Sequence, residues 1–136
     1  MTTSSLELQA AIYDVLTGDG AIMAIANNVY DHVPGEPFGA KTAYISFGAQ
    51  DTIDDDADCI RGVETTLQVD IWSKEPGVVE CKRLTDMVRA KLHRASLTLA
   101  TNALVDLRVV LTRTMPDPGG DHHGVVQVTA MIEEPN

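Results

Sequence analysis

Five aspartates lie among the eight residues that begin at Asp51, and their side chains could bind a divalent cation or hold a polyanion away from the surface. They are Asp51, Asp54, Asp55, Asp56 and Asp58. A calcium-binding loop needs a glycine at its sharp turn and a closing glutamate, and this run lacks both at the required spacing. We therefore favour a solvated tip over a metal site, and we expect no cofactor.

Histidine and cysteine are the other residue types that could do chemistry. His122 and His123 are consecutive, so an extended chain would point them in opposite directions, and no further Cys or His follows at a zinc-ligand spacing. Cys81 falls on the apolar stripe of an expected helix, where a buried thiol is unreactive, and Cys59 lies beside aspartates that disfavour a thiolate. Motifs such as G-x-S-x-G and H-E-x-x-H are absent, so the sequence does not favour an enzyme.

Negative charge is concentrated in the first part of the chain. The formal net charge is -10, and residues 1–58 hold ten of the twenty acidic residues but one of the ten basic residues. Neutralising phosphates requires a basic surface, so ordinary binding to DNA or RNA is not expected. An acidic surface suits a protein past which nucleic acid moves without sticking. The N-terminal residues lack a basic region and a long apolar run, so we expect no membrane contact and a cytoplasmic chain with reduced thiols.

A group of basic residues lies on the helix expected between Pro76 and Arg94. They are Lys82, Arg83, Arg89, Lys91 and Arg94. Such a surface is most often simply solvated, but it could instead pair with the acidic surface of a neighbouring copy and set the orientation of an assembly. Trp72, on the polar side of its strand, is a further candidate contact, and packing of its ring under a loop is the alternative.

Two amphipathic helices and several strands must position these residues. Leu8, Ile12 and Leu16 follow hydroxyl caps at helical spacing, and Cys81, Leu84, Val88 and Leu92 repeat this pattern. A short helix from Gly20 to Asn28 and an extended "VYDHVP" segment are expected between them. We predict one α+β domain over residues 1–136, in which a mostly antiparallel sheet of about four strands carries two amphipathic helices on one face.

The strands are predicted from alternation of apolar and polar residues. The segments are "AYISFGA", Val63 to Trp72, Val105 to Thr112 and Val126 to Ile132. In the third, Val105, Leu107, Val109 and Leu111 are expected to share one apolar face opposite Arg108. The last two strands should pair antiparallel across the turn that contains His122 and His123.

The order of these residues resembles a known family. The segments "LQAAIYDVLTGDGAIMAIANNVYDHVP", "AYISFGA" and "LQVDIWSKEPGVVECKRLTDMVRAKL" are similar to the tail terminator, or tail completion, proteins of long-tailed phages and gene transfer agents. The most specific part is a strand ending in "DIWS", followed by a Pro-Gly break and an amphipathic helix, with "VYDHVP" about forty residues upstream. The resemblance covers almost the whole chain.

The resemblance implies a structural virion protein that caps the head-proximal end of a tail tube, ends tube polymerisation and joins the tail to the head connector. It would form a ring of six copies, with the tail tube protein and a head connector or stopper protein as partners, assembled in the bacterial cytoplasm. DNA would pass through the ring without specific binding, and at least part of the acidic run would line the lumen. The Arg108-bearing strand and its partner would be candidates for pairing between subunits.

Three alternatives stay open at this point. A tail tube protein or a connector stopper could have a similar fold. A small metal-dependent or hydrolytic enzyme could use Asp54 to Asp58 with His122 or His123. A monomeric regulatory adaptor is the third.

Overall fold

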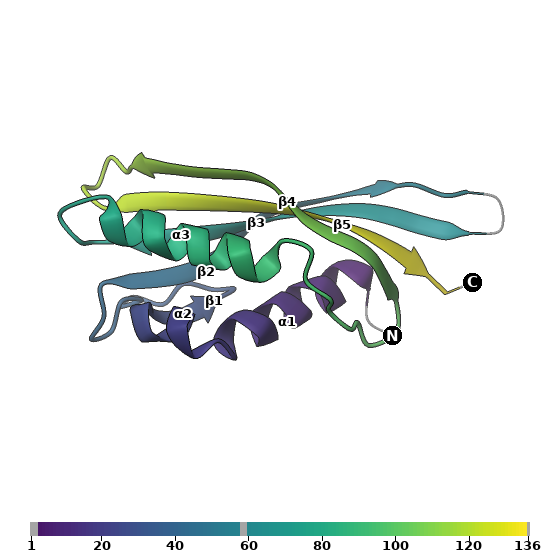
Figure 1. The fold of residues 1–136 in the computed structure, drawn as a ribbon, viewed down its shortest axis with the longest axis horizontal. Coiled ribbons are helices and arrows are strands. Elements are labelled where there is room, and N and C mark those ends of the chain that lie inside the picture. Colours follow the sequence, from purple (N-terminus) through teal and green to yellow (C-terminus); the bar gives the residue numbers. More distant parts are fainter. Residues whose placement is uncertain (1–2, 58–59, 136) are drawn as a thin grey trace.

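The computed structural model describes residues 3–57 and 60–135, which form three helices and one five-stranded sheet. The elements are α1 (Ser4–Thr17), α2 (Gly20–Ile25), β1 (Ala26–Tyr30), β2 (Ala43–Asp54), β3 (Arg61–Ser73), α3 (Val79–Leu92), β4 (Ala103–Pro116) and β5 (His122–Glu134). The sheet order is β1-β2-β3-β5-β4, in which β1 and β2 are parallel and the other pairs antiparallel. The predicted α+β class is confirmed, with helices on one face of a mostly antiparallel sheet (Figure 1). The strand beyond the predicted four is β1, which takes the last three residues of the helix predicted from Gly20 to Asn28 and the first two of the extended "VYDHVP" segment. That helix therefore ends at Ile25, and its prediction was wrong from Ala26 onward.

The two long helices form because apolar side chains recur at helical spacing behind polar caps. In α1, Leu8, Ile12 and Leu16 are buried, and the Thr3 hydroxyl accepts a hydrogen bond from the Leu6 N–H at 3.3 Å. In α3, the predicted stripe of Cys81, Leu84, Val88 and Leu92 is buried with Thr85. The helix starts at Val79, so Pro76 lies before it and not in its first turn as expected.

The faces of the central strands are those that the alternation predicts. On β3, Leu67, Val69 and Ile71 are fully buried beneath the helices, whereas Thr66, Gln68 and Trp72 lie on the opposite face and are half-buried. On β5, the apolar set from Val126 to Ile132 is buried in the same core. Each such strand places one set of side chains in the core and the other on a polar face, called here the open face.

Strand β4 departs from its predicted alternation because it contains two bulges. The register with β5 shifts between Leu104 and Asp106 and again between Val109 and Leu111. Each extra residue reverses the direction of the following side chains. Val105 and Val110 are therefore exposed, and Leu111 shares the open face with Arg108, so the predicted common apolar face is wrong.

The acidic run was expected to be a loop or hairpin tip, and it is in part a strand. β2 continues to Asp54, and Gln50 to Asp54 pair residue by residue with Leu67 to Val63 of β3. Together the two strands form an arm, called here the acidic arm (residues 50–57 and 60–64), which extends past the helices at one end of the molecule (Figure 1). Cross-strand hydrogen bonding holds these aspartates in a strand despite their poor β propensity.

Two glutamates tie the helices to the sheet. In α1, buried Glu7 accepts hydrogen bonds from the backbone N–H groups of Thr101 and Asn102, at 2.9 and 3.0 Å, and from both of their side chains. In α3, Glu80 accepts from the hydroxyls of Thr42 and Ser73, each at 2.7 Å. These carboxylates fix the start of β4 and the adjoining ends of β2 and β3 against the helical layer.

Candidate functional site

The acidic arm presents its carboxylates to solvent. Asp51, Asp54, Asp55 and Asp56 are all exposed. At the tip, the Asp55 N–H donates to the Gly62 carbonyl at 2.9 Å, and the Asp56 carboxylate accepts from the Gly62 N–H at 3.0 Å. Asp58 and Cys59 lie outside the described residues. Among residues 3–57 and 60–135, no ion pair joins the carboxylates of the arm to a basic side chain, and the pairing of β2 with β3 keeps the backbone extended.

The alternative that joins these aspartates to His122 or His123 in an enzyme site does not fit the register. Asp54 pairs with Val63 at one end of β3, and His123 pairs with Trp72 near the other end. Nine residues along a strand span about 30 Å, too far for shared ligation or proton transfer. Within residues 3–57 and 60–135, no group of three or more His, Cys, Asp or Glu side chains is arranged to hold a metal ion.

Cys81 is buried in α3, as its place on the apolar stripe predicts. Burial raises the pKa of its thiol, so the neutral form is favoured. A neutral, enclosed thiol is a poor nucleophile and metal ligand. This side chain acts as part of the core.

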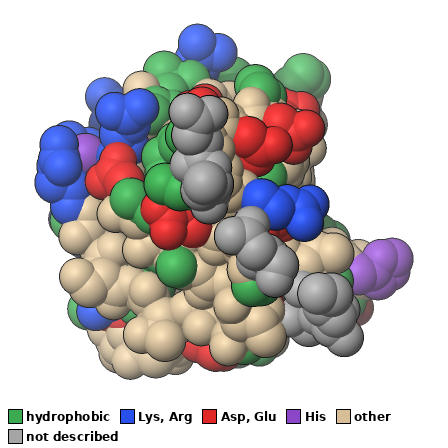
Figure 2. Space-filling model, turned by 90° about the vertical axis from the view of Figure 1, so that its right-hand side faces the viewer, with side chains coloured by type: hydrophobic (Ala, Val, Ile, Leu, Met, Phe, Trp, Pro, Cys, Tyr) green, Lys and Arg blue, Asp and Glu red, His purple; other side chains and the backbone are tan. Residues whose placement is uncertain are grey.

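The basic surface predicted on α3 is present. Lys82, Arg83 and Arg89 are exposed on the side of the helix away from the sheet. Lys91 pairs with Asp19 of the α2 N-terminus at 3.4 Å, so part of its charge is used within the subunit. Arg108 is exposed on the open face of β4. Figure 2 views the molecule from the end at which the acidic arm projects and shows basic side chains gathered along its left side, with acidic side chains in the upper half.

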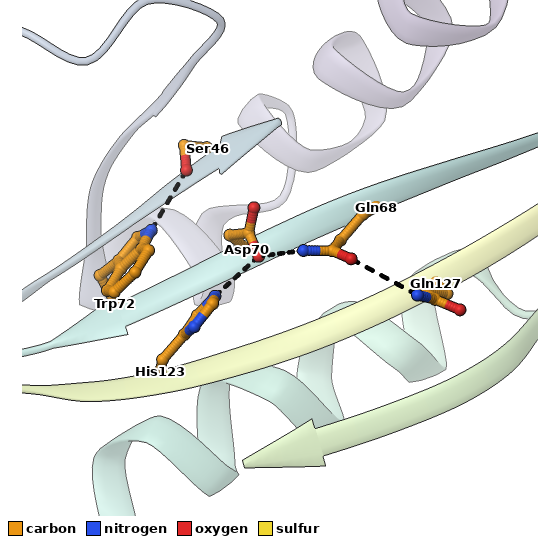
Figure 3. Close-up of polar contacts among 6 residues, drawn as sticks. All are labelled: Ser46, Gln68, Asp70, Trp72, His123 and Gln127. Carbon is orange, nitrogen blue, oxygen red and sulfur yellow. Dashed lines mark hydrogen bonds and ion pairs between the residues drawn. The ribbon is translucent and has the colours of Figure 1, made fainter. Parts of the chain in front are cut away.

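Trp72 lies within a network on the open face (Figure 3). Its ring stacks on the His123 imidazole, with centroids 3.9 Å apart and planes 6° apart, and its indole N–H donates to the Ser46 hydroxyl at 3.2 Å. The Tyr44 ring also stacks on the Trp72 ring, with centroids 6.3 Å apart. The ring is thus held among β2, β3 and β5, and its role as a contact with a partner stays a prediction.

Asp70 is the centre of the polar part of this network. Its carboxylate lies 2.7 Å from the His123 imidazole and accepts from the Gln68 amide at 2.8 Å, and Gln68 in turn accepts from Gln127 at 3.4 Å (Figure 3). Burial, and then the charges of Asp121, Asp117 and Asp70, raise the pKa of neighbouring Tyr44. The sequence did not indicate this network because its central pair, Asp70 and His123, lies 53 residues apart in the chain.

Among the described residues, no helix is long and apolar enough to cross a membrane.

Comparison with known proteins gives one family and one shared fold. The model of the family described as Tail completion protein gp17 matches residues 10–133. The chain is also similar to a chain of a solved structure described as "Virion of native gene transfer agent (GTA) particle", with a TM-score of 0.84 and 24% sequence identity. That match covers 98% of this chain and 99% of the other, and it shows a shared fold. No curated protein matches the sequence.

Proposed function

The chain belongs to the tail completion protein gp17 family, whose members are structural tail proteins of virions, and we propose that it is the terminator of a phage-like tail. In this proposal it caps the head-proximal end of the tail tube, stops tube polymerisation and joins the tail to the head connector or stopper. It acts as a ring of six copies that assembles in the bacterial cytoplasm and carries no catalytic site.

The observation that carries this proposal is the division of charge within one subunit. An exposed acidic arm projects past the body, and exposed Lys82, Arg83 and Arg89 lie on α3. A subunit with two surfaces of opposite charge favours head-to-tail contacts, and such contacts close into a ring when the rotation between copies allows it. The basic helix, Trp72 and Arg108 are the proposed contact residues for neighbouring copies or for the tube and connector.

The acidic arm would face the lumen in this ring. Carboxylates along the bore repel phosphate, so DNA slides through without binding. Asp54, Asp55 and Asp56 are exposed as this role requires. A structure of the assembled ring with these side chains on its outer rim would overturn the lumen assignment.

Deletion of the protein from the producing system tests the terminator role. Electron microscopy of the resulting particles should show tails of excess and variable length that do not join heads, because nothing stops tube growth. Particles without any tails would indicate a tube protein, and tails of normal length that fail to join heads would indicate a connector stopper.

Charge reversal tests the lumen role separately. The variant that carries Asp55→Lys and Asp56→Lys, beyond the end of β2, should assemble particles of normal length but deliver less DNA, because phosphates would bind to the bore. The variant that carries Asp14→Lys and Glu36→Lys changes the net charge equally at exposed sites outside the arm, and it should deliver DNA normally. Equal delivery by both variants would contradict the lumen role.

A further inference from the structure

Besides the outer edge of the short strand β1, the described sheet leaves two backbone edges without a strand neighbour. One is the outer edge of β4 after Val109, where β4 pairs only with β5. Before that point the Arg94 N–H donates to the Leu107 carbonyl and the Val109 N–H donates to the His93 imidazole. The other is the outer edge of β2 beyond Ser46, because the short strand β1 pairs with β2 only between Ala43 and Ser46. Unpaired edges expose rows of N–H and C=O groups, and such edges add readily to another strand.

The two edges have matching regular segments. In β4, residues Leu111 to Pro116 follow the second bulge and pair with β5 without a register shift. In β2, residues Gln50 to Asp54 follow the bulge after Phe47 and pair with β3 without a shift. Each segment is therefore straight enough to form a ladder of about five residues with a new neighbour.

The side chains on these segments carry opposite charges. Arg113 is exposed on the open face of β4, and Arg108 lies on the same face farther along the strand. Asp51 is exposed on the open face of β2, and Asp54 is exposed at the end of that strand. Two copies of the β4 edge would place arginines together, and two copies of the β2 edge would place aspartates together. Like charges opposite one another disfavour both symmetric pairings, so pairing of β4 with β2 is preferred.

Each of the two edges also has exposed apolar surface beside it, which pairing of the edges would bury. Val110 is 50% exposed at the bulge beside the regular segment of β4. Beside the free edge of β2 lies a groove of about 470 Å³, lined by Leu6 and Tyr13 of α1, residues 28–31 and Phe47. Leu6 is 59% exposed and Tyr13 is 40% exposed, so this groove would bury apolar area if a neighbour covered it.

We propose that β4 of one copy adds to the free edge of β2 in the next copy, with Arg113 facing Asp51 and Val110 covering the groove beside α1. This inference rests on the ring of the proposed function and names the surface that closes it. The contact joins two different patches, so it repeats around the ring and pairs the free segments of β4 and β2 in every copy. The occupant of the β2 edge is a second copy of this chain, selected by its charge and its strand length.

Disulfide cross-linking in assembled particles tests this contact. In a background that carries Cys59→Ser, the variant with Arg113→Cys and Asp51→Cys should give a ladder of covalent multimers under mild oxidation, because paired strands bring opposite Cα atoms within disulfide reach. The control with Arg113→Cys and Thr98→Cys places the second thiol at an exposed site outside the proposed contact and should stay monomeric. Multimers in the control alone, or adducts with another tail protein, would overturn the proposed edge while leaving the terminator role intact.

Charge exchange supplies a second measurement if the cysteine variants fail to assemble. Arg113→Asp alone and Asp51→Arg alone should each lower the yield of joined particles, and the double variant should restore much of it. Failure of the double variant to exceed either single variant would contradict the pairing. A particle that contains a single copy of the chain would overturn the ring and this contact together.

Discussion

Gly124 of β5 lies so close to Thr85 of α3 that a methyl group on Gly124 would stand 2.1 Å from the threonine hydroxyl oxygen. The same methyl group would lie 3.2 Å from the Ile71 Cβ and 3.3 Å from the Cys81 sulfur. A glycine is thus needed for α3 to pack directly on the sheet at this point.

Gly124→Ala should lower the free energy of unfolding by about 1–3 kcal/mol, because the added methyl group must push the helix away or distort the strand. Urea unfolding followed by tryptophan fluorescence measures this change. Gly77→Ala is the matched control, since no atom lies within 4 Å of a methyl group there. Equal stability of both variants would contradict the close packing.

Glu7→Ala should lower the free energy of unfolding by about 2 kcal/mol or more, since the buried Glu7 carboxylate accepts several hydrogen bonds from Thr101 and Asn102 that the variant loses. Urea unfolding followed by tryptophan fluorescence measures this change in the free energy of unfolding. Glu36→Ala, at an exposed site, should change it by less than about 0.5 kcal/mol. A small effect at Glu7 would show that water replaces the carboxylate readily.

The lowered pKa of the Asp19 carboxyl should make the stability of the protein depend on pH. The Ile22 backbone N–H, and then Lys91 and the Ala21 N–H, hold the pKa of its carboxyl below the ordinary value of 3.8. A lowered folded pKa means that the charged form stabilises the fold above about pH 4 and that this contribution is lost as the pH falls through the folded pKa. Asp19→Asn should therefore be less stable than the wild type at pH 7 and about equal to it near pH 2. An equal difference in stability between Asp19→Asn and the wild type at both pH values would argue against an effect of the Asp19 charge.

Trp72 is the single tryptophan of the chain, so its emission reports the open-face network directly. His123→Ala removes the ring stacked at 3.9 Å and lets water reach the indole, so the emission maximum should move to longer wavelength. His32→Ala, at an exposed histidine, should leave it unchanged. Identical spectra for both variants would contradict the stacked geometry.

The reversal of charge at Asp55 and Asp56 should lower the free energy of unfolding by no more than about 1.5 kcal/mol, since both side chains are exposed and one hydrogen bond, from the Gly62 N–H to the Asp56 carboxylate, is lost. Urea unfolding of the purified variant checks this expectation. A large loss of stability would mean that any fall in DNA delivery reflects misfolding and not the charge of the bore.

Much of the fold follows from local patterns in the sequence. The stripe from Cys81 to Leu92 and the alternation around Leu67 each indicate one buried face, and a helix and a strand that bury these faces must pack together. The resemblance to tail completion proteins is confirmed because it rests on several such segments in order. Residue spacing alone was sufficient for these features.

Other features depend on contacts that no local pattern records. The bulges of β4 reversed its faces because the register with β5, and not the alternation from Val105 onward, decides which side chains are buried. The acidic run continued β2 because Arg61 to Ser73 supplied a partner strand. Asp70 and His123 meet only through the pairing of β3 with β5, so the network around Trp72 had no sequence signal.

The position of β5 in the sheet also constrains how the chain reaches its native state. β5 follows the other seven elements in the chain, yet it lies between β3 and β4 and joins them. A nascent chain that lacks β5 has two separate groups of strands and no continuous core, because long-range pairing must wait for this segment. Translation must therefore deliver β5 before a subunit exists, which keeps incomplete copies from being incorporated into a particle.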